Sequence, residues 1–408
     1  MSTIASPLGR TLRGLDWLNF VLTDVPTGVG PFLAVYLAGY GWNVQSVGIA
    51  LTVGGIAGIL SQTPMGALID HLSSKRELFS LGVIALAVGA LLIAFLPTFW
   101  PVISAQILIG CTLSILGPAI CAVSLEIVGL TSFDRRQGRN LAFYSAGNVV
   151  AAISMGLLGY FISNRSIFFF VAASAIPTVL CQLIVGPDDI YYKRAQETKP
   201  GDETGKHDGI FALLKDQRLA VFLVCSVLFQ FASAAMLPLL GQLVAKSNGL
   251  NPMIFMSACV VITQLVIALL ASWTGQKAGL WGRKPLLLMA FGALLIRGIS
   301  YTLTNNTDAL IALQILDGVA SGTFGVVSVL VIADLTEGTG RFNITLGAFS
   351  TAVGIGISLS QVIAGSIVHH YGATTGFMFL ASVATVAFAI LFVFMPETCG
   401  KRVTKVLS

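Results

Sequence analysis

The amino-acid sequence predicts an all-α membrane protein with twelve transmembrane helices in two pseudo-symmetric six-helix bundles. Three observations predict this class. Of the 408 residues, 55% are hydrophobic and only 10% are charged, whereas a soluble domain carries about 25% charged residues. Apolar stretches long enough to cross a bilayer recur along the chain. One charged segment divides those stretches into two equal sets, which share short sequence motifs.

The apolar stretches are the predicted membrane spans. A spanning helix needs about 20 mostly apolar residues. The stretches are continuously apolar rather than alternating, which favours helices over a β-barrel. The twelve predicted spans cover residues 15–39, 46–69, 78–96, 100–128, 141–163, 166–186, 219–245, 253–275, 285–304, 308–333, 344–369 and 373–395.

A polar linker separates the two sets of six spans. Residues 187–218, with the sequence PDDIYYKRAQETKPGDETGKHDGIFALLKDQR, are rich in charges and turn-forming residues. We therefore expect an N-terminal bundle over 1–186 and a C-terminal bundle over 219–408, joined by this linker.

The basic residues predict the orientation in the membrane, because loops that face the cytoplasm carry an excess of Lys and Arg. With both termini on the cytoplasmic side, all but three of the 23 basic residues fall on that side. The exceptions are Arg165, Lys246 and Arg297. We expect a multi-pass protein of the cytoplasmic (inner) membrane. The first apolar run is read as a span rather than a cleaved leader, because it exceeds 20 residues and contains Asp24.

The two halves repeat at a nearly constant offset. QILIG at 106–110 returns as QILDG at 314–318. Glu126 and Asp334 close the corresponding spans at the same offset, and Pro31 matches Pro238 at an offset one residue smaller. These matches in chain order predict a duplicated six-helix unit.

Four short segments resemble motifs of the major facilitator superfamily. GALIDHLSSKR at 66–76 and GQKAGLWGRK at 275–284 resemble the loop signature that follows the second and eighth spans of that family. DLTEGTGR at 334–341 resembles the element that follows the tenth span. PETCGK at 396–401 resembles the PETKGK ending of the sugar porters.

This resemblance implies transport by alternating access, and the chain looks most like a bacterial branch in which some members move drugs or siderophores. It also implies a latch on the cytoplasmic side, in which Glu126 and Asp334 would pair with Arg139 or Arg341. The residues of the implied latch are Asp70, Glu126, Arg139, Asp334 and Arg341. Many members carry an arginine where this chain has Gln106, and that departure weighs against a drug/proton antiporter.

Asp24 is the main candidate for substrate or proton handling. A charge at mid-membrane costs about 2.5–3.5 kcal/mol on insertion scales, and such acids usually face a cavity. The prolines at 26 and 31 interrupt the helix in the same stretch. The alternative is that Asp24 is held by Asn19 or Asn148 and never titrates. Further polar residues either line the cavity or bond neighbouring helices: Asn148, Gln230, Gln106, Gln314 and Gln361.

Arg297 and Asp317 are the other charges within spans. They lie at similar depth on the ninth and tenth spans, so we expect them to form an intramembrane ion pair with a structural role.

The sequence as a whole indicates a secondary transporter. We find no nucleotide-binding motif, nucleophile constellation or metal-ligand spacing, and we expect no enzyme activity, cofactor or metal. A channel and a membrane-embedded enzyme are the rival classes. We expect a monomer that exports an amphipathic small molecule, such as a drug or siderophore, coupled to protons. The alternative is proton-coupled import of a nutrient or iron chelate.

Overall fold

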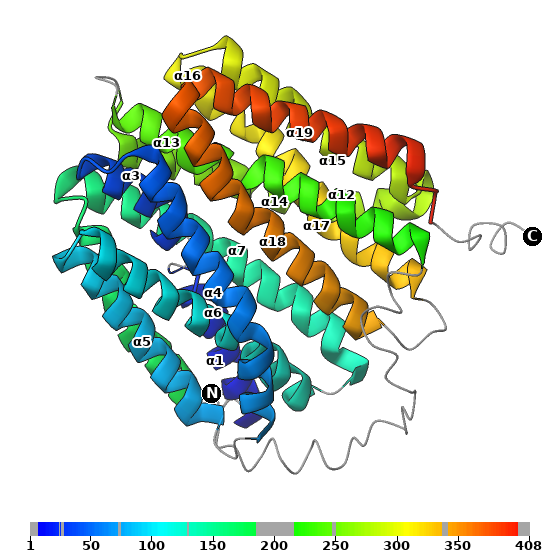
Figure 1. Cartoon of the computed structure of the whole chain (residues 1–408). Helices are drawn as coiled ribbons and strands as arrows, with labels where there is room; N and C mark the ends of the chain where they lie inside the picture. Colours follow the sequence, from blue (N-terminus) through cyan, green and yellow to red (C-terminus); the bar gives the residue numbers. More distant parts are fainter. Residues whose placement is uncertain are drawn as a thin grey trace, which may run out of the picture. The chain divides into compact units, whose positions relative to one another are not determined.

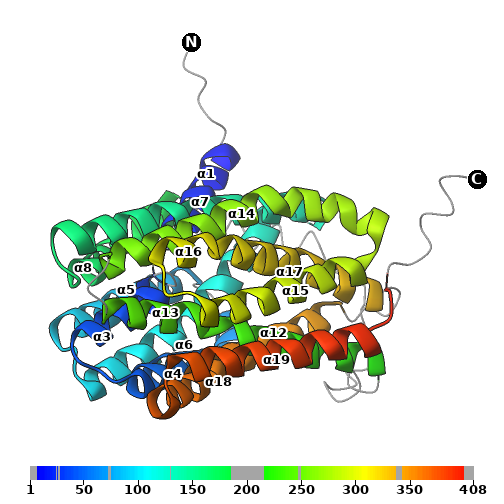
Figure 2. The same cartoon turned by 90° about the horizontal axis from the view of Figure 1, so that it is seen from above.

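The computed structural model describes residues 7–23, 25, 28–71, 75–128, 130–184, 216–246, 250–336 and 342–398. All regular secondary structure within these ranges is helical (Figures 1 and 2). The chain divides into two compact units. The first comprises residues 1–40 and 53–202, and the second comprises 41–52 and 203–408. The boundaries of the predicted bundles and linker therefore remain predictions, because α4 begins in the second unit and continues in the first.

The helices that begin before residue 200 are α1 (Pro7–Val21), the π-helical turn η1 (Gly28–Phe32), α3 (Leu33–Gly39), α4 (Val44–His71), α5 (Lys75–Phe95), α6 (Phe99–Val128), α7 (Leu130–Phe161), α8 (Ser166–Ala173) and α9 (Ala175–Ile184). In the first unit α1 packs against α7 and α9, and α5 packs against α6 and α8. Tyr36 of α3 joins this packing, because its hydroxyl donates to Ile93 O at 3.2 Å and its ring lies 4.6 Å from that of Phe168.

The second unit contains α12 (Gln217–Ala234), α13 (Met236–Ala245), α14 (Pro252–Trp281), α15 (Arg283–Leu303), α16 (Thr307–Ala312), α17 (Gln314–Leu335), α18 (Phe342–Tyr371) and α19 (Ala373–Phe394). Figures 1 and 2 show α15 beside both α17 and α19, and α12 beside α18 and α19. Phe229 and Phe324 stack at 4.1 Å in its core, and Phe291 packs 4.8 Å from Phe229.

Nine of the described helical segments are long and apolar enough to cross a membrane. Three shorter apolar helices cover 30–39, 79–95 and 99–114. Each of these twelve segments overlaps one of the predicted spans. The all-helical membrane fold predicted from the composition is therefore confirmed.

Four predicted spans consist of more than one helix. The first is divided into α1, η1 and α3, and the others are interrupted at Ser174, Ala235 and Leu313. Prolines account for three of these breaks. Pro31 lies within η1, Pro177 follows the break at Ser174 by three residues, and Pro238 follows the break at Ala235 by three residues. A proline has no N–H, so the carbonyl four residues earlier loses its helical partner. Nothing in the sequence accounts for the break before α17.

The repeated QILxG motifs make the same kind of contact in each unit. A Cβ on Gly110 of α6 would overlap the carbonyl oxygen of Gly54 on α4, and one on Gly318 of α17 would lie 2.9 Å from Thr263 O on α14. Small residues at such crossings let helix backbones approach closely. The motif therefore marks a close helix crossing in both halves of the chain.

Candidate functional site

Asp24, together with Pro26 and Thr27, lies outside the described residues. The described residues around it show that the first predicted span is not a continuous α-helix. α1 ends at Val21, Thr23 lies in a turn with its hydroxyl donating to Phe20 O at 2.8 Å, and η1 begins at Gly28. In the sequence, Asp24 therefore stands between the end of α1 and the start of η1.

Three of the amides predicted near the cavity are buried in helix packing. Asn148 of α7 is hydrogen-bonded to Tyr144 one turn away. Gln106 lies against Gly54, on which a Cβ would stand 2.7 Å from the Gln106 Oε1. Gln314 is fully buried, and its Nε2 donates to Tyr301 Oη at 2.8 Å. Of the two readings that the sequence left open, the contacts of Asn148 and Gln314 favour bonding within and between helices, whereas the buried Gln106 Nε2 has no hydrogen-bond partner among the described residues.

Gln361 and its neighbour Ser360, on α18, form hydrogen bonds with backbone groups at the break between α12 and α13. The carbonyl of Ala234, freed by the proline in α13, accepts from Gln361 Nε2 at 3.0 Å. The Ser360 hydroxyl donates to Phe231 O at 2.5 Å and accepts the N–H of Ala235 at 3.2 Å. Two side chains of one helix thus replace the backbone hydrogen bonds that another helix has lost.

Gln230 is the remaining amide of the predicted set, and it is half-buried on α12 one residue before Phe231. It lies beside Gly356 of α18, where a Cβ would stand 3.1 Å from the Gln230 Cβ and 2.5 Å from Val227 O. Gln230 therefore lies near the α12–α13 break that Ser360 and Gln361 contact. Of the five amides, Gln230 is the most accessible side chain at a helix discontinuity.

Arg297 and Asp317 form an ion pair between Arg297 Nη1 and Asp317 Oδ1. The arginine side chain is 1% exposed and the aspartate side chain 13%. Arg297 Nη2 also lies 3.3 Å from Ser233 O and 3.2 Å from Met236 Sδ, and the guanidinium stands 5.7 Å from the centre of the Tyr301 ring. The arginine therefore contacts α17 and both sides of the α12–α13 break.

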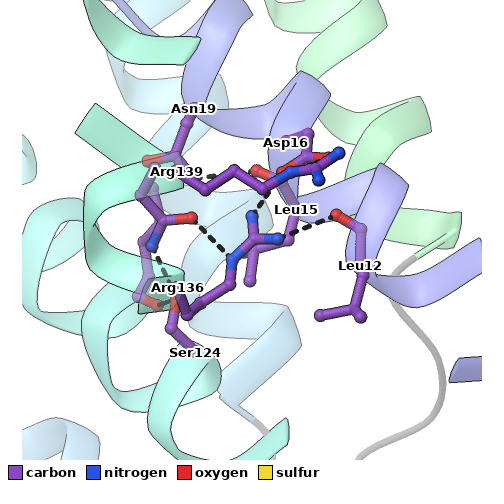
Figure 3. Close-up of polar contacts among 9 residues, drawn as sticks. Leu12, Leu15, Asp16, Asn19, Ser124, Arg136 and Arg139 are labelled. Carbon is purple, nitrogen blue, oxygen red and sulfur yellow. Dashed lines mark hydrogen bonds and ion pairs between the residues drawn. The ribbon is translucent and has the colours of Figure 1, made fainter. Parts of the chain in front are cut away.

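The charged end of the first unit holds a network that the sequence analysis missed (Figure 3). Asp16 of α1 lies between two arginines of α7. Arg139 Nε stands 3.0 Å from both carboxylate oxygens and its Nη2 2.7 Å from Oδ2, while Arg136 Nη2 stands 2.7 Å from Oδ1. Asp16 and Arg136 are buried, and the Arg139 side chain is 58% exposed.

The network continues through neutral side chains. Arg136 Nε donates to Asn140 Oδ1 at 2.8 Å, and Asn140 Nδ2 donates to Ser124 Oγ on α6 at 2.9 Å. Burial lowers the pKa of the Arg136 guanidinium, and the Asp16 carboxylate acts against that shift. The network therefore ties α1, α6 and α7 together around one buried carboxylate.

Two members of the expected latch have other partners among the described residues, and the expected pairs with Glu126 and Arg341 stay a prediction. The carboxylate partner of Arg139 in the structure is Asp16, because α7 packs against α1 at this end. Asp334 pairs with Arg283 at 3.0 Å, since Arg283 begins α15, which packs on α17. The side chains of Asp70 and Glu126, and the whole of Arg341, lie outside the described residues.

The segment that resembles PETKGK caps α15. The Glu397 carboxylate accepts the backbone N–H groups of Arg283 at 2.7 Å and Lys284 at 3.0 Å. A carboxylate at a helix N-terminus satisfies free N–H groups and the helix dipole. Gly282 precedes them at φ +91°, a conformation that favours glycine. Two segments that resemble one family are thus joined directly in this fold.

Two compact helical units, with broken spans and buried polar groups at the breaks, define a multi-pass membrane transport protein. A sequence profile of the Major Facilitator Superfamily matches residues 17–309 and 256–406. The chain belongs to this superfamily, and it is a secondary transporter of a small molecule rather than an enzyme.

Two relatives carry the name MFS-type transporter, one of them matched over nearly its full length. An uncharacterized MFS-type transporter of Mycobacterium tuberculosis is 40% identical over 404 residues, covering 98% of this chain and 97% of the relative. The uncharacterized MFS-type transporter YdeE of Escherichia coli is 25% identical over 238 residues, 58% of each chain.

Solved structures share the fold at low identity. The nucleoside transporter NupG has a TM-score of 0.75 at 18% identity, over 94% of this chain and 98% of that one. A D-xylose–proton symporter has a TM-score of 0.72 at 14% identity, over 98% and 100%. At such identities the likeness shows the fold alone.

Proposed function

We propose that this transporter exports an amphipathic small molecule, such as a drug or siderophore, in exchange for protons by alternating access. It would act as a monomer in the cytoplasmic membrane, with both termini in the cytoplasm. The observation that supports this proposal most is a matched pair of broken spans. The stretch that contains Pro31 is divided into α1, η1 and α3, and its counterpart by sequence offset, which contains Pro238, is divided at Ala235.

Broken helices expose backbone polar groups, which a membrane tolerates only inside the protein or along an aqueous cavity. In secondary transporters, such discontinuities lie at the substrate and ion sites near the midplane. Asp24 supplies the one acid of the first broken span beyond its charged end, and we assign it the coupling proton. Gln230, beside the second break, is our candidate substrate contact among the described amides.

The polar pairs at the charged helix ends would serve as supports for the latch. Asp16 with Arg136 and Arg139, and Asp334 with Arg283, each join helices of a single unit. We propose that these pairs keep each unit rigid. Asp70, Glu126 and Arg341 remain proposed members of the latch by family resemblance.

The direction of coupling can be tested in liposomes that contain the purified chain, with ethidium and a hydroxamate siderophore as probes. Proton exchange predicts that a probe accumulates in an acidic lumen, whichever way the protein is inserted. Proton symport, the importer alternative, predicts accumulation in an alkaline lumen. Accumulation that follows the membrane potential with no dependence on the pH gradient would contradict proton coupling altogether.

A further inference from the structure

Two parallel stripes of side chains run along α1 and α7, and each passes from a cation through an aromatic ring to apolar residues. On α1 the stripe is Arg13, Trp17 and Phe20, and on α7 it is Arg139 and Phe143 followed by glycine and valine positions. Spacings of three and four residues keep each stripe on one face of its helix.

Ring contacts join the two stripes. The Trp17 ring lies 6.4 Å from Phe143 in an edge arrangement and 5.4 Å from Phe20, and the Arg139 guanidinium stands 5.6 Å from the centre of the Phe143 ring. The helices touch just beyond, because a Cβ on Gly147 would overlap Phe20 O. The Trp17 side chain is nevertheless 53% exposed, so this aromatic cluster faces outward.

An apolar groove follows the aromatic cluster. It has a volume of about 340 Å³ between α1, α7 and the α8–α9 break, and Phe20 belongs both to its wall and to the cluster. Its lining includes Phe20, Val21, Gly147, Val150, Ala173 and Pro177. The polar side chain in its wall, Ser174, donates its hydroxyl to Val171 O at 2.7 Å, which leaves the lining apolar.

The charged end of the stripes has more cations than anions among the described side chains. Asp16 offsets one charge of Arg136 and Arg139, and Arg13 is exposed one helical turn from Asp16. The end therefore carries a net positive charge next to an outward-facing tryptophan. Trp at a membrane interface and Lys or Arg beside it are the usual anchors for lipid headgroups.

We propose that α1, α7 and the α8–α9 break bind one anionic glycerophospholipid of the leaflet in which α1 begins. Its phosphate would lie between Arg13 and the exposed Arg139, its glycerol against Trp17, and one acyl chain in the groove. Val21 lies eight residues after Arg13, about 12 Å further along the helix, which places the groove below the headgroup at acyl-chain depth. Charge complementarity at one end and an apolar groove at the other select an anionic lipid.

Native mass spectrometry of the full chain in detergent tests this site with 1-palmitoyl-2-oleoyl phosphatidylglycerol and the matching phosphatidylcholine. We expect one phosphatidylglycerol to be retained at concentrations where phosphatidylcholine is not. Arg13→Gln should weaken retention about fivefold, the effect of one basic residue near an anionic surface. Arg218→Gln removes an exposed cation from α12 and should leave retention unchanged.

Filling the groove tests the acyl chain separately. Val150→Trp should abolish retention, whereas Ile153→Trp, which places the same side chain at an exposed α7 position that does not line the groove, should not. Ala173→Phe fills the groove from the opposite wall if the first variant unfolds. Equal retention of both lipids, retention in both filled variants, or a protein dimer that Val150→Trp disrupts would each overturn the proposal.

Discussion

Asp16 shows how a single carboxylate organises one end of the first unit. It lies between a buried arginine and an exposed one, so its removal would affect the two arginines differently. Arg136 would be buried without a countercharge, while Arg139 can turn to water. The arrangement predicts that Asp16 and Arg136 contribute much more to stability than Arg139 does.

Asp16→Asn should therefore reduce the free energy of unfolding by about 3–5 kcal/mol, the usual effect of breaking a buried ion pair. Arg139→Gln should cost about 1 kcal/mol or less, because the remaining Arg136 still neutralises the acid. Denaturant unfolding in detergent measures both. Asp308→Asn, at an exposed acid on α16, is the control, and a loss as small as the control's in Asp16→Asn would rule out the buried-pair argument.

The Arg297–Asp317 pair is asymmetric in its surroundings. Without Arg297, Asp317 keeps the hydroxyl of Thr263 at 3.3 Å and that of Ser321 at 3.5 Å and remains partly exposed. Without Asp317, the fully buried guanidinium has neutral neighbours among the described residues, namely Ser233, Met236 and Tyr301. We expect Asp317→Asn to destabilise more than Arg297→Gln, and the double variant to be milder than Asp317→Asn alone. Equal thermal stability of all three variants would contradict the pairing energetics.

The sequence predicts one of the two ion pairs and not the other. Arg297 and Asp317 lie well inside spans with clear ends, so depth alone places them together. Asp16 lies at the edge of an apolar run, and Arg136 lies between two predicted spans. The spacing of Arg136, Arg139 and Asn140 on one helical face was the available signal, but only packing shows which acid they meet.

At the scale of elements, the α12–α13 break depends on side chains of a neighbouring helix. Ser360 bridges Phe231 O and the Ala235 N–H, so one hydroxyl contacts a backbone acceptor and a backbone donor at the break. Sequence patterns foresee that prolines interrupt a span. They do not predict the hydrogen bonds from Ser360, because this residue is separated from the break by more than a hundred residues.

Ser360→Ala should destabilise the chain by about 1–3 kcal/mol, since it removes the hydroxyl that donates to Phe231 O at a buried helix break. Amide hydrogen exchange of the segment around Ala235 should accelerate. Ser350→Ala is the matched control, because that exposed hydroxyl on the same helix donates to Leu346 O one turn back in its own helix. Unchanged exchange at the break in Ser360→Ala would show that the hydroxyl does not hold it.

At the scale of the whole molecule, composition and periodicity predict the helical fold, and the basic residues predict its orientation. The repeat is visible in sequence because a glycine at a close helix crossing tolerates little change of size, as at Gly110 and Gly318. Superposing the two units should bring Gln106 onto Gln314 and Pro31 onto Pro238. The pairing of loop charges is not visible in sequence, because resemblance transfers motif positions and not partners.

Cysteine labelling tests the orientation. In a chain whose six native cysteines are replaced by serine, Asn164→Cys, next to exposed Arg165, should react with a membrane-impermeant maleimide in intact cells. Gln217→Cys, at the start of α12, should react only after the membrane is opened. The reverse pattern would place both termini outside.

The central claim is that Asp24 carries the coupling proton, and transport by Asp24→Asn in proteoliposomes tests it most directly. The variant should insert and unfold at a temperature no lower than that of the parent chain, because it removes a costly intramembrane charge. It should lose accumulation driven by a pH gradient and retain exchange of labelled for unlabelled substrate, since binding and alternating access do not themselves require the proton. Gradient-driven accumulation at the parent rate, or a variant that fails to fold while its remaining activity keeps the parent pH dependence, would contradict the claim.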